Sequence, residues 1–293
     1  MMKKIVRQFF DFFLFSNIFI ALCAVAQGLV TFYLIDVKPL PRIAWLLFTA
    51  TLLVYNFGLL TAKPENPHQS PSKRMNWFFA HHRLMVTITI VSFLSLSVLF
   101  FQLSTLLEVL LVILSVISLT YNMPFFKLNG IRTGIRNIPG LKQFLITLVW
   151  SVSSVLIPVF EAWQSALTLI SFQDAFVLFA ERFLFYGALT IPFDVRDLDE
   201  DIKAGVKTIP VIWGEKNAYL LCGTLLAGYF LLLLLCSNYR FTGNFWALAF
   251  TTFTAGWIIF KWKLKKNEYY YFFCVDGVLI LQYVMLLLFN SIK

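Results

Sequence analysis

Five carboxylates stand within residues 194–201, which read DVRDLDED, in a chain that is otherwise poor in charge. Three of them, Asp194, Asp197 and Asp201, are spaced i, i+3 and i+7, and a helix would place them within an arc of about 60°. Convergent carboxylates repel one another unless a cation or protons intervene. Mg²⁺ takes oxygen ligands and is typically held by one or two carboxylates together with substrate phosphates. The spacing therefore favours a Mg²⁺–phosphate site, and the alternative is an ordinary solvated helix end.

The residues around these three aspartates refine that expectation. Asp199 and Glu200 point away from the shared face of the predicted helix, so we expect both to be dispensable. Gly205 permits a turn, after which Thr208 and Pro210 restart the chain.

The composition identifies the solvent of the elements that must position the aspartates. Of the 293 residues, 59% are hydrophobic and 13% are charged, whereas a soluble domain carries roughly 25% charged residues. Stretches long enough to cross roughly 30 Å of hydrocarbon predict membrane helices rather than barrel strands. The sequence thus predicts an all-α bundle of nine transmembrane helices, with no separate soluble domain within residues 1–293. They fall in residues 12–35, 43–62, 84–126 (two helices), 143–160, 172–193, 217–239, 241–260 and 269–292.

The distribution of Lys and Arg predicts the orientation of this integral membrane protein. With the N-terminus inside, 19 basic residues fall in inner segments and 5 on the outer side, so we expect a cytoplasmic N-terminus and cytoplasmic acidic segment in the cell (inner) membrane. The net charge of +9 then belongs to the cytoplasmic face, where it attracts anionic lipid. Nucleic-acid binding is not expected, because the basic residues are spread over five segments.

Several motifs resemble the UbiA superfamily of intramembrane prenyltransferases. The segment DVRDLDEDIKAGVKTIPV is similar to that family's second aspartate motif, DxxDxxxD followed by GxxTxP. YNMPFFKL, IRNIPGLKQFLITLVW and DGVLILQ resemble other family segments, so the likeness covers nearly the whole chain. The resemblance implies a nine-helix bundle that transfers an isoprenyl group from its diphosphate to a hydrophobic acceptor, often an aromatic or quinone precursor. It also implies that Asp194, Asp197 and Asp201 hold catalytic Mg²⁺ and that Lys127 contacts the diphosphate.

The family's first motif, NxxxDxxxD, is incomplete in this chain. Asn56 fits the pattern, but Leu60 and Pro64 occupy the aspartate positions and cannot bind metal. One explanation is that a single Mg²⁺ suffices while lysine or arginine neutralises the rest of the diphosphate. The other is a catalytically altered protein that binds a prenyl or lipid phosphate without turnover. The predicted substrate-binding residues are Asn56, Lys63, Arg74 and Lys127.

Other polar residues receive more ordinary interpretations. We expect the histidines to be interfacial, since no HxxxH spacing is present, and Glu108 to begin a helix. Glu181 and Arg182 are expected to pair structurally with other helices, while Asp276 is a candidate orienting residue in the cavity. The histidines are His68, His81 and His82.

Overall fold

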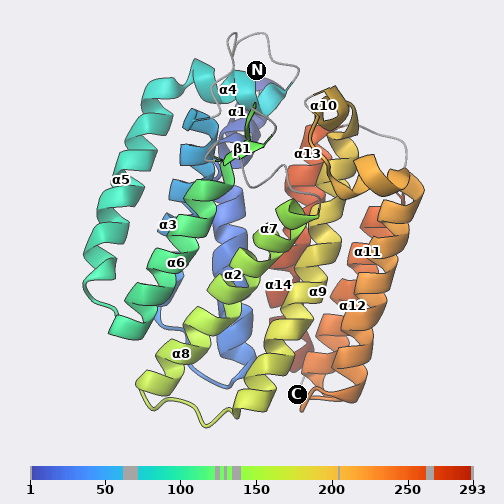
Figure 1. The fold of residues 1–293 in the computed structure, drawn as a ribbon. Helices are drawn as coiled ribbons and strands as arrows, with labels where there is room; N and C mark the ends of the chain where they lie inside the picture. The colour runs from blue at the N-terminus through green and yellow to red at the C-terminus, as the bar shows by residue number, and fades with distance from the viewer. Residues whose placement is uncertain are drawn as a thin grey trace.

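The computed structural model describes residues 2–61, 72–122, 126–128, 131–133, 140–203, 205–261 and 267–291, which form a helical bundle with one short hairpin (Figure 1). The helices are α1 (Met2–Phe15), α2 (Ile18–Leu34), α3 (Pro41–Thr61), α4 (Lys73–Ala80), α5 (His82–Phe100), α6 (Thr105–Asn122), α7 (Leu141–Ser151), α8 (Ile157–Gln164), α9 (Phe172–Arg196), α10 (Leu198–Lys203), α11 (Ile209–Leu235), α12 (Gly243–Lys261), α13 (Glu268–Tyr270) and α14 (Gly277–Ser291). The strands β1 (Phe126–Leu128) and β2 (Ile131–Thr133) pair antiparallel, with Lys127 opposite Arg132.

Two π-helical turns join short helices into longer ones. The turn Val152–Leu156 links α7 to α8, and the turn Tyr271–Val275 links α13 to α14. Each joined pair forms one apolar helix of 24 residues, Leu141–Gln164 and Glu268–Ser291 respectively.

The number of membrane spans differs from the sequence expectation. Within the described ranges, six helices are long and apolar enough to cross a membrane, and the α1–α2 pair, bent by 58°, makes a seventh if it is one span. Both α6, whose apolar part is Thr105–Thr120, and α12 fall outside these groups. A helix lies in each of the nine predicted apolar stretches, but nine spans are not established.

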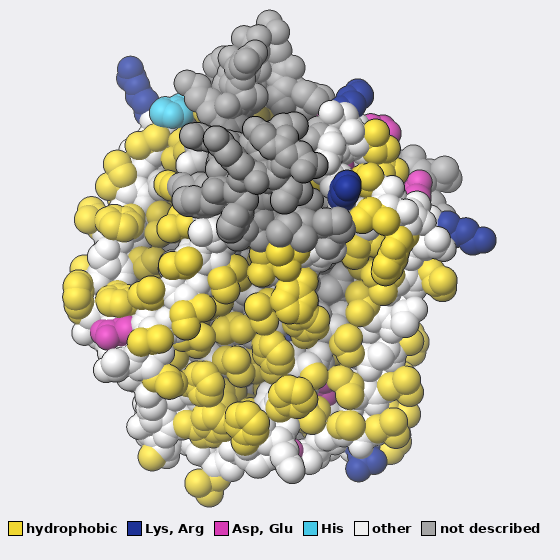
Figure 2. Space-filling model, viewed as in Figure 1, with side chains coloured by type: hydrophobic (Ala, Val, Ile, Leu, Met, Phe, Trp, Pro, Cys, Tyr) yellow, Lys and Arg dark blue, Asp and Glu magenta, His cyan; other side chains and the backbone are white. Residues whose placement is uncertain are grey.

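Hydrophobic side chains cover much of the surface that faces the viewer in Figure 2, as expected of a bundle surrounded by lipid. On α5, Val91, Leu94 and Val98 are each more than half exposed, and on α6 so are Val109 and Val116. In water such a surface would be an aggregation hazard, whereas in a bilayer it contacts acyl chains. The protein is therefore an all-helical integral membrane protein.

Helix α9, in which the acidic segment begins, and helix α2 each pack against several other helices. Helix α9 packs against α7 and α11, and α2 packs against α3 and α14. The N-terminus, α4, α10 and α13 all lie at one end of the bundle, opposite the C-terminus (Figure 1). This end is where α9 finishes, so the acidic segment lies at a mouth of the bundle.

Charged side chains in the middle of α9 make contacts with other elements. Arg182 donates from Nη1 to Gln282 Oε1 of α14 at 2.8 Å. Glu181 accepts hydrogen bonds from Ser237 and Tyr239, which lie between α11 and α12. These contacts fit the structural pairing expected of Glu181 and Arg182.

Candidate functional site

The acidic segment begins on α9 and continues beyond its end. Asp194 lies in the last turn of α9, Asp197 is the residue that ends the helix with φ −91° and ψ 8°, and Asp201 belongs to the separate helix α10. The prediction that one continuous helix presents all three carboxylates is therefore wrong, because α9 ends at Arg196 and Asp197 has a non-helical backbone before α10 begins. Gly205 adopts φ +67°, which confirms the turn predicted there.

Lys142 brings two of the three aspartates together. Its Nζ lies 2.5 Å from Asp194 Oδ1 and 3.8 Å from Asp201 Oδ2. Asp197 is held differently, because Arg196 donates from Nε and Nη2 to its two carboxylate oxygens at 2.7 and 2.9 Å. Basic side chains thus supply part of the compensation that convergent carboxylates need.

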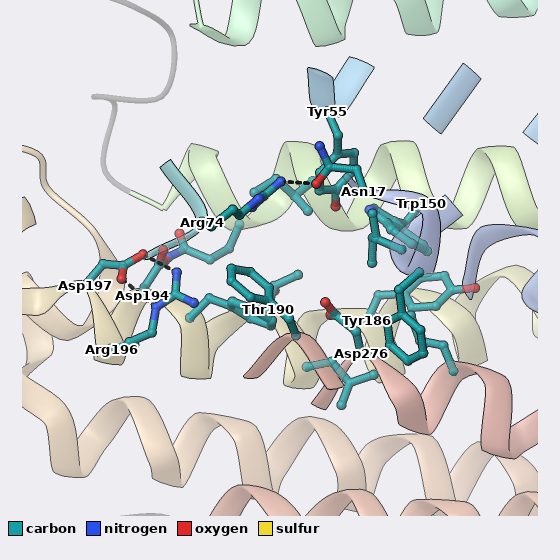
Figure 3. Close-up of a pocket in the computed structure, with 18 of the residues that line it drawn as sticks. Asn17, Tyr55, Arg74, Trp150, Tyr186, Thr190, Asp194, Arg196, Asp197 and Asp276 are labelled. Carbon is teal, nitrogen blue, oxygen red and sulfur yellow. Dashed lines mark hydrogen bonds and ion pairs between the residues drawn. The ribbon is translucent and has the colours of Figure 1, made fainter. Parts of the chain in front are cut away.

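A cavity of about 240 Å³ opens beside these residues (Figure 3). Asp194 and Arg196 line it from α9, and Asp197 from the residue that follows this helix. Lys142 and Gln143 line it from α7, and Arg74 from α4. The rest of the wall is mostly apolar or aromatic and includes Leu14, Phe19, Ile20, Tyr55, Ile146, Trp150, Tyr186, Leu189, Phe193, Phe272 and Leu279. The cavity therefore has a charged end and an apolar, largely aromatic remainder, which we call the aromatic body.

Arg74 reaches the cavity from α4, which lies outside the candidate membrane spans. It donates from Nη2 to Asn17 Oδ1, and Asn17 in turn donates to Asn56 Oδ1 at 2.6 Å. Asn17 sits in the bend between α1 and α2 with φ +66°, a conformation that asparagine tolerates better than most residues. Burial lowers the pKa of the Arg74 guanidinium, but an arginine remains charged in proteins. Asn56 is thus a buried support for Arg74 rather than a wall residue.

The two arginines of the cavity stack on the same aromatic ring. Cζ of Arg74 lies 5.0 Å from the centroid of Phe272, and Cζ of Arg196 lies 5.2 Å from it. Arg196 also lies over Phe193 and Tyr271. Cation–π contacts of this kind hold a guanidinium in place while leaving its N–H groups available to another partner.

Several buried polar atoms of this wall have no hydrogen-bond partner among the described residues. They include one cationic donor on each arginine, one carboxylate oxygen and both polar atoms of one amide side chain, namely Arg74 Nε, Arg196 Nη1, Asp194 Oδ2, Gln143 Nε2 and Gln143 Oε1. Buried polar atoms are nearly always satisfied in native proteins, by protein, water or ligand. An anion could accept from the two arginine nitrogens, and a cation could bind the free Asp194 oxygen.

The remaining predicted residues have mixed outcomes. Lys63 and His68 lie outside the described residues, and for Lys127 only the backbone in β1 is described. Leu60 packs against Phe78 and Phe79 in a small apolar cluster, in keeping with its inability to bind metal.

Two histidines, Glu108 and Asp276 complete the comparison with the sequence predictions. His81 and His82 are exposed and do not line the cavity, and Glu108 lies in the first turn of α6, as predicted. Asp276 lines the cavity, which agrees with its interpretation from the sequence as a candidate orienting residue there.

Sequence reasoning missed four polar residues of the site. Lys142 and Gln143 lie in the first turn of α7, inside the family-like segment IRNIPGLKQFLITLVW, and Arg196 stands between two aspartates of the acidic segment. The positions of Lys142 and Arg196 in the sequence could both have indicated a cation beside the carboxylates. Asn17 gave no signal, because its role depends on the bend between α1 and α2.

Comparison with known proteins places this geometry in a family. A model of the UbiA prenyltransferase family matches residues 80–270. The structure of a UbiA homolog from Archaeoglobus fulgidus bound to GPP and Mg²⁺ is similar, with a TM-score of 0.65, 12% identity, and coverage of 96% of this chain and 99% of that one. The apo structure of a UbiA homolog from Aeropyrum pernix K1 has a TM-score of 0.58 and 13% identity over 95% and 96% of the two chains. No curated protein matches the sequence. The family match spans well over half of the sequence and the fold agrees with it, so this chain belongs to the UbiA prenyltransferase family.

Proposed function

We propose that this protein transfers an isoprenyl group from a prenyl diphosphate to a hydrophobic acceptor within the membrane. The observation that best supports this proposal is a set of charged atoms at one end of the cavity that have no hydrogen-bond partner among the described residues. These atoms are Arg74 Nε, Arg196 Nη1 and Asp194 Oδ2. A diphosphate with its metal would give these atoms partners, and a prenyl tail would occupy the aromatic body. The similar structure from Archaeoglobus fulgidus, which holds GPP and Mg²⁺, supports the choice of ligand.

The chemistry of the acidic segment fits Mg²⁺. Among the described side chains, no group of three His, Cys, Asp or Glu residues is arranged to hold a metal ion by itself. Mg²⁺, however, commonly takes one or two carboxylates and completes its shell with waters and substrate phosphates. Asp194 and Asp197 line the cavity, and we assign them with Asp201 as the residues that would hold the ion. When bound, Mg²⁺ neutralises charge that develops on the leaving diphosphate.

The basic residues of the wall would share this task. Arg74 Nε and Arg196 Nη1 have no hydrogen-bond partner among the described residues, and both guanidinium groups stack on Phe272. They bind the diphosphate oxygens and stabilise the negative charge as the bond to the prenyl group breaks. Lys142 lies close enough to neutralise Asp194 whenever no metal is present. Lys63 and Lys127, expected from the sequence, are proposed as further diphosphate contacts.

The aromatic body of the cavity suits the other product of bond cleavage. An allylic carbocation is stabilised by the faces of aromatic rings, and Trp150, Tyr186 and Phe193 are available in the wall. The apolar surroundings also exclude water, which would otherwise capture the cation before the acceptor does.

We also propose nine spans within a single domain of residues 1–293, with α6 and α12 counted as membrane helices. The N-terminus and the cavity mouth then face the cytoplasm, as the distribution of basic residues predicts. A reporter domain fused after Lys293 should lie outside the cytoplasm. A cytoplasmic signal from that reporter would contradict the topology.

The function is tested with purified protein, Mg²⁺ and a panel of prenyl diphosphates and ring acceptors. We expect pyrophosphate release that depends on both Mg²⁺ and acceptor, together with a prenylated product detected by mass spectrometry. Absence of pyrophosphate release from every combination would rule out the transferase activity.

A second function, binding of a prenyl or lipid phosphate without turnover, is favoured by one observation. Leu60 occupies an aspartate position of the family's first motif and is packed among apolar side chains. In this case the protein would bind prenyl diphosphate in a Mg²⁺-dependent manner and release no pyrophosphate. The same experiment with a binding measurement added distinguishes the two functions.

A further inference from the structure

Asp276 presents to the cavity a carboxylate that the diphosphate site does not use. It lines the cavity from the junction between the π-helical turn Tyr271–Val275 and α14. In Figure 3 it lies between the group formed by Asp194, Arg196 and Asp197 and the pair formed by Trp150 and Tyr186. This is the boundary between the charged end and the aromatic body, where the reacting carbon of a bound prenyl diphosphate would lie.

The backbone of Asp276 is fixed by contacts on both sides. Its N–H donates to Tyr271 O at 3.2 Å, which closes the π-helical turn Tyr271–Val275. Its carbonyl oxygen accepts from the fully buried Cys23 Sγ at 3.3 Å. Single π-helical turns within helices occur frequently at functional sites, because they redirect a side chain. The position of the carboxylate in the wall is therefore built into the helix.

The carboxylate of Asp276 is half-buried. No described residue donates a hydrogen bond to it, although it is electrostatically coupled to Arg74 and Arg196. The donors that the two arginines commit go elsewhere, to Asn17 and to Asp197. Partial burial removes water from a carboxylate at a cost in free energy, which a hydrogen bond offsets. A ligand that brings a donor would remove that cost.

We infer that Asp276 binds the acceptor substrate through an O–H group and receives the proton that the acceptor loses. This inference rests on the proposed transferase function. In the step, the bond between the prenyl carbon and the diphosphate oxygen breaks and its electron pair leaves with diphosphate. A new bond forms from the acceptor's nucleophilic carbon or oxygen to the prenyl carbon. The proton released from that nucleophile, directly or through the hydroxyl group, passes to the Asp276 carboxylate.

The same residue restricts the class of acceptor. A phenol, hydroquinone or naphthol that is uncharged at the end facing Asp276 can donate to the carboxylate. An acceptor with its own carboxylate at this end would be repelled by like charge, and a methyl ether would leave Asp276 without a donor.

The test compares wild type with Asp276→Asn, Asp276→Glu and the control Cys274→Ala, which alters a neighbouring residue that does not line the cavity. Affinity for a non-hydrolysable thiolo analogue of GPP is measured first. Transfer is then measured with phenols, hydroquinones and naphthols, each with its methyl ether and carboxylated form. Binding of these acceptors is measured separately in the presence of the analogue.

Asp276→Asn should bind the analogue as tightly as wild type or more tightly, because a negative charge near two arginines is removed. Its transfer rate should fall about a hundredfold or more, the usual contribution of a positioned base, and its preference for phenols over methyl ethers should disappear. Asp276→Glu should recover at least part of the rate, and Cys274→Ala should behave as wild type. Transfer by Asp276→Asn within threefold of wild type, or parallel loss of analogue binding and transfer, would overturn the inference. If wild type transfers to no acceptor, the proposed function fails. The role of Asp276 is tested separately by acceptor binding, and equal affinities of wild type and Asp276→Asn for the phenols would refute it.

Discussion

Replacement of Lys142 by Met removes the cation that compensates the buried part of the acidic segment. Its Nζ lies 2.5 Å from Asp194 Oδ1, and the side chains of Lys142 and Asp194 are 18% and 4% exposed. Loss of one partner of a buried ion pair costs about 3–5 kcal/mol, because the other charge stays buried without compensation. The partial exposure of Lys142 places this case at the lower end. We therefore expect the free energy of unfolding of the metal-free protein to fall by about 3 kcal/mol.

Mg²⁺ should reverse much of this loss, because a divalent cation on Asp194 replaces the missing ammonium group. The measurement is unfolding in mixed micelles of increasing SDS content, followed by tryptophan fluorescence in EDTA and then in Mg²⁺. Lys216→Met, which removes an exposed lysine, is the matched control and should change little. The double variant Lys142→Met/Asp194→Asn should be more stable than Lys142→Met alone, since it also removes the buried charge of Asp194.

Two results would refute this reasoning about Lys142. One is equal stability of Lys142→Met and Lys216→Met in EDTA, which would mean that the pair contributes nothing. The other is a stabilisation of Lys142→Met by Mg²⁺ no larger than that of wild type, which would mean that the metal does not bind at Asp194.

Three further predictions concern ligand binding by the same cavity. Asp197→Asn should weaken Mg²⁺-dependent prenyl-diphosphate affinity about a hundredfold while the exposed Glu200→Gln does not, and equal effects in titration calorimetry would indicate a merely solvated helix end. Arg74→Gln should weaken diphosphate affinity at least about tenfold at every Mg²⁺ concentration, because it removes a charged donor; unchanged affinity would exclude Arg74 from the site. Glu268→Gln should weaken diphosphate affinity about fivefold, because Glu268 accepts from the N–H groups of Lys73 and Arg74 at 2.8 and 3.0 Å and so holds the start of α4. An effect equal to that of Arg74→Gln would contradict this indirect role.

Local patterns of the sequence determined the class of the protein and the position of its acidic segment. Apolar runs specify membrane helices because each run must satisfy its own backbone hydrogen bonds in lipid. The spacing of Asp194, Asp197 and Asp201 and the turn at Gly205 are likewise local, and this segment carried the resemblance to the family that the comparisons confirm. The prediction of one helix face was wrong because periodicity alone does not reveal where a helix ends.

Only the tertiary structure decided which charges meet. Arg74 enters the cavity because it contacts Asn17, 57 residues away, and Lys142 lies against Asp194 because α7 packs against α9. Asp276 lines the cavity because a π-helical turn and Cys23, far away in the sequence, fix its backbone. Such contacts depend on how helices bend and pack, and a residue's own neighbours in the sequence carry little information about either. The sequence therefore predicted the acidic half of the site and offered Arg74 and Asp276 as candidates, whereas Lys142, Arg196 and Asn17 emerged only from packing.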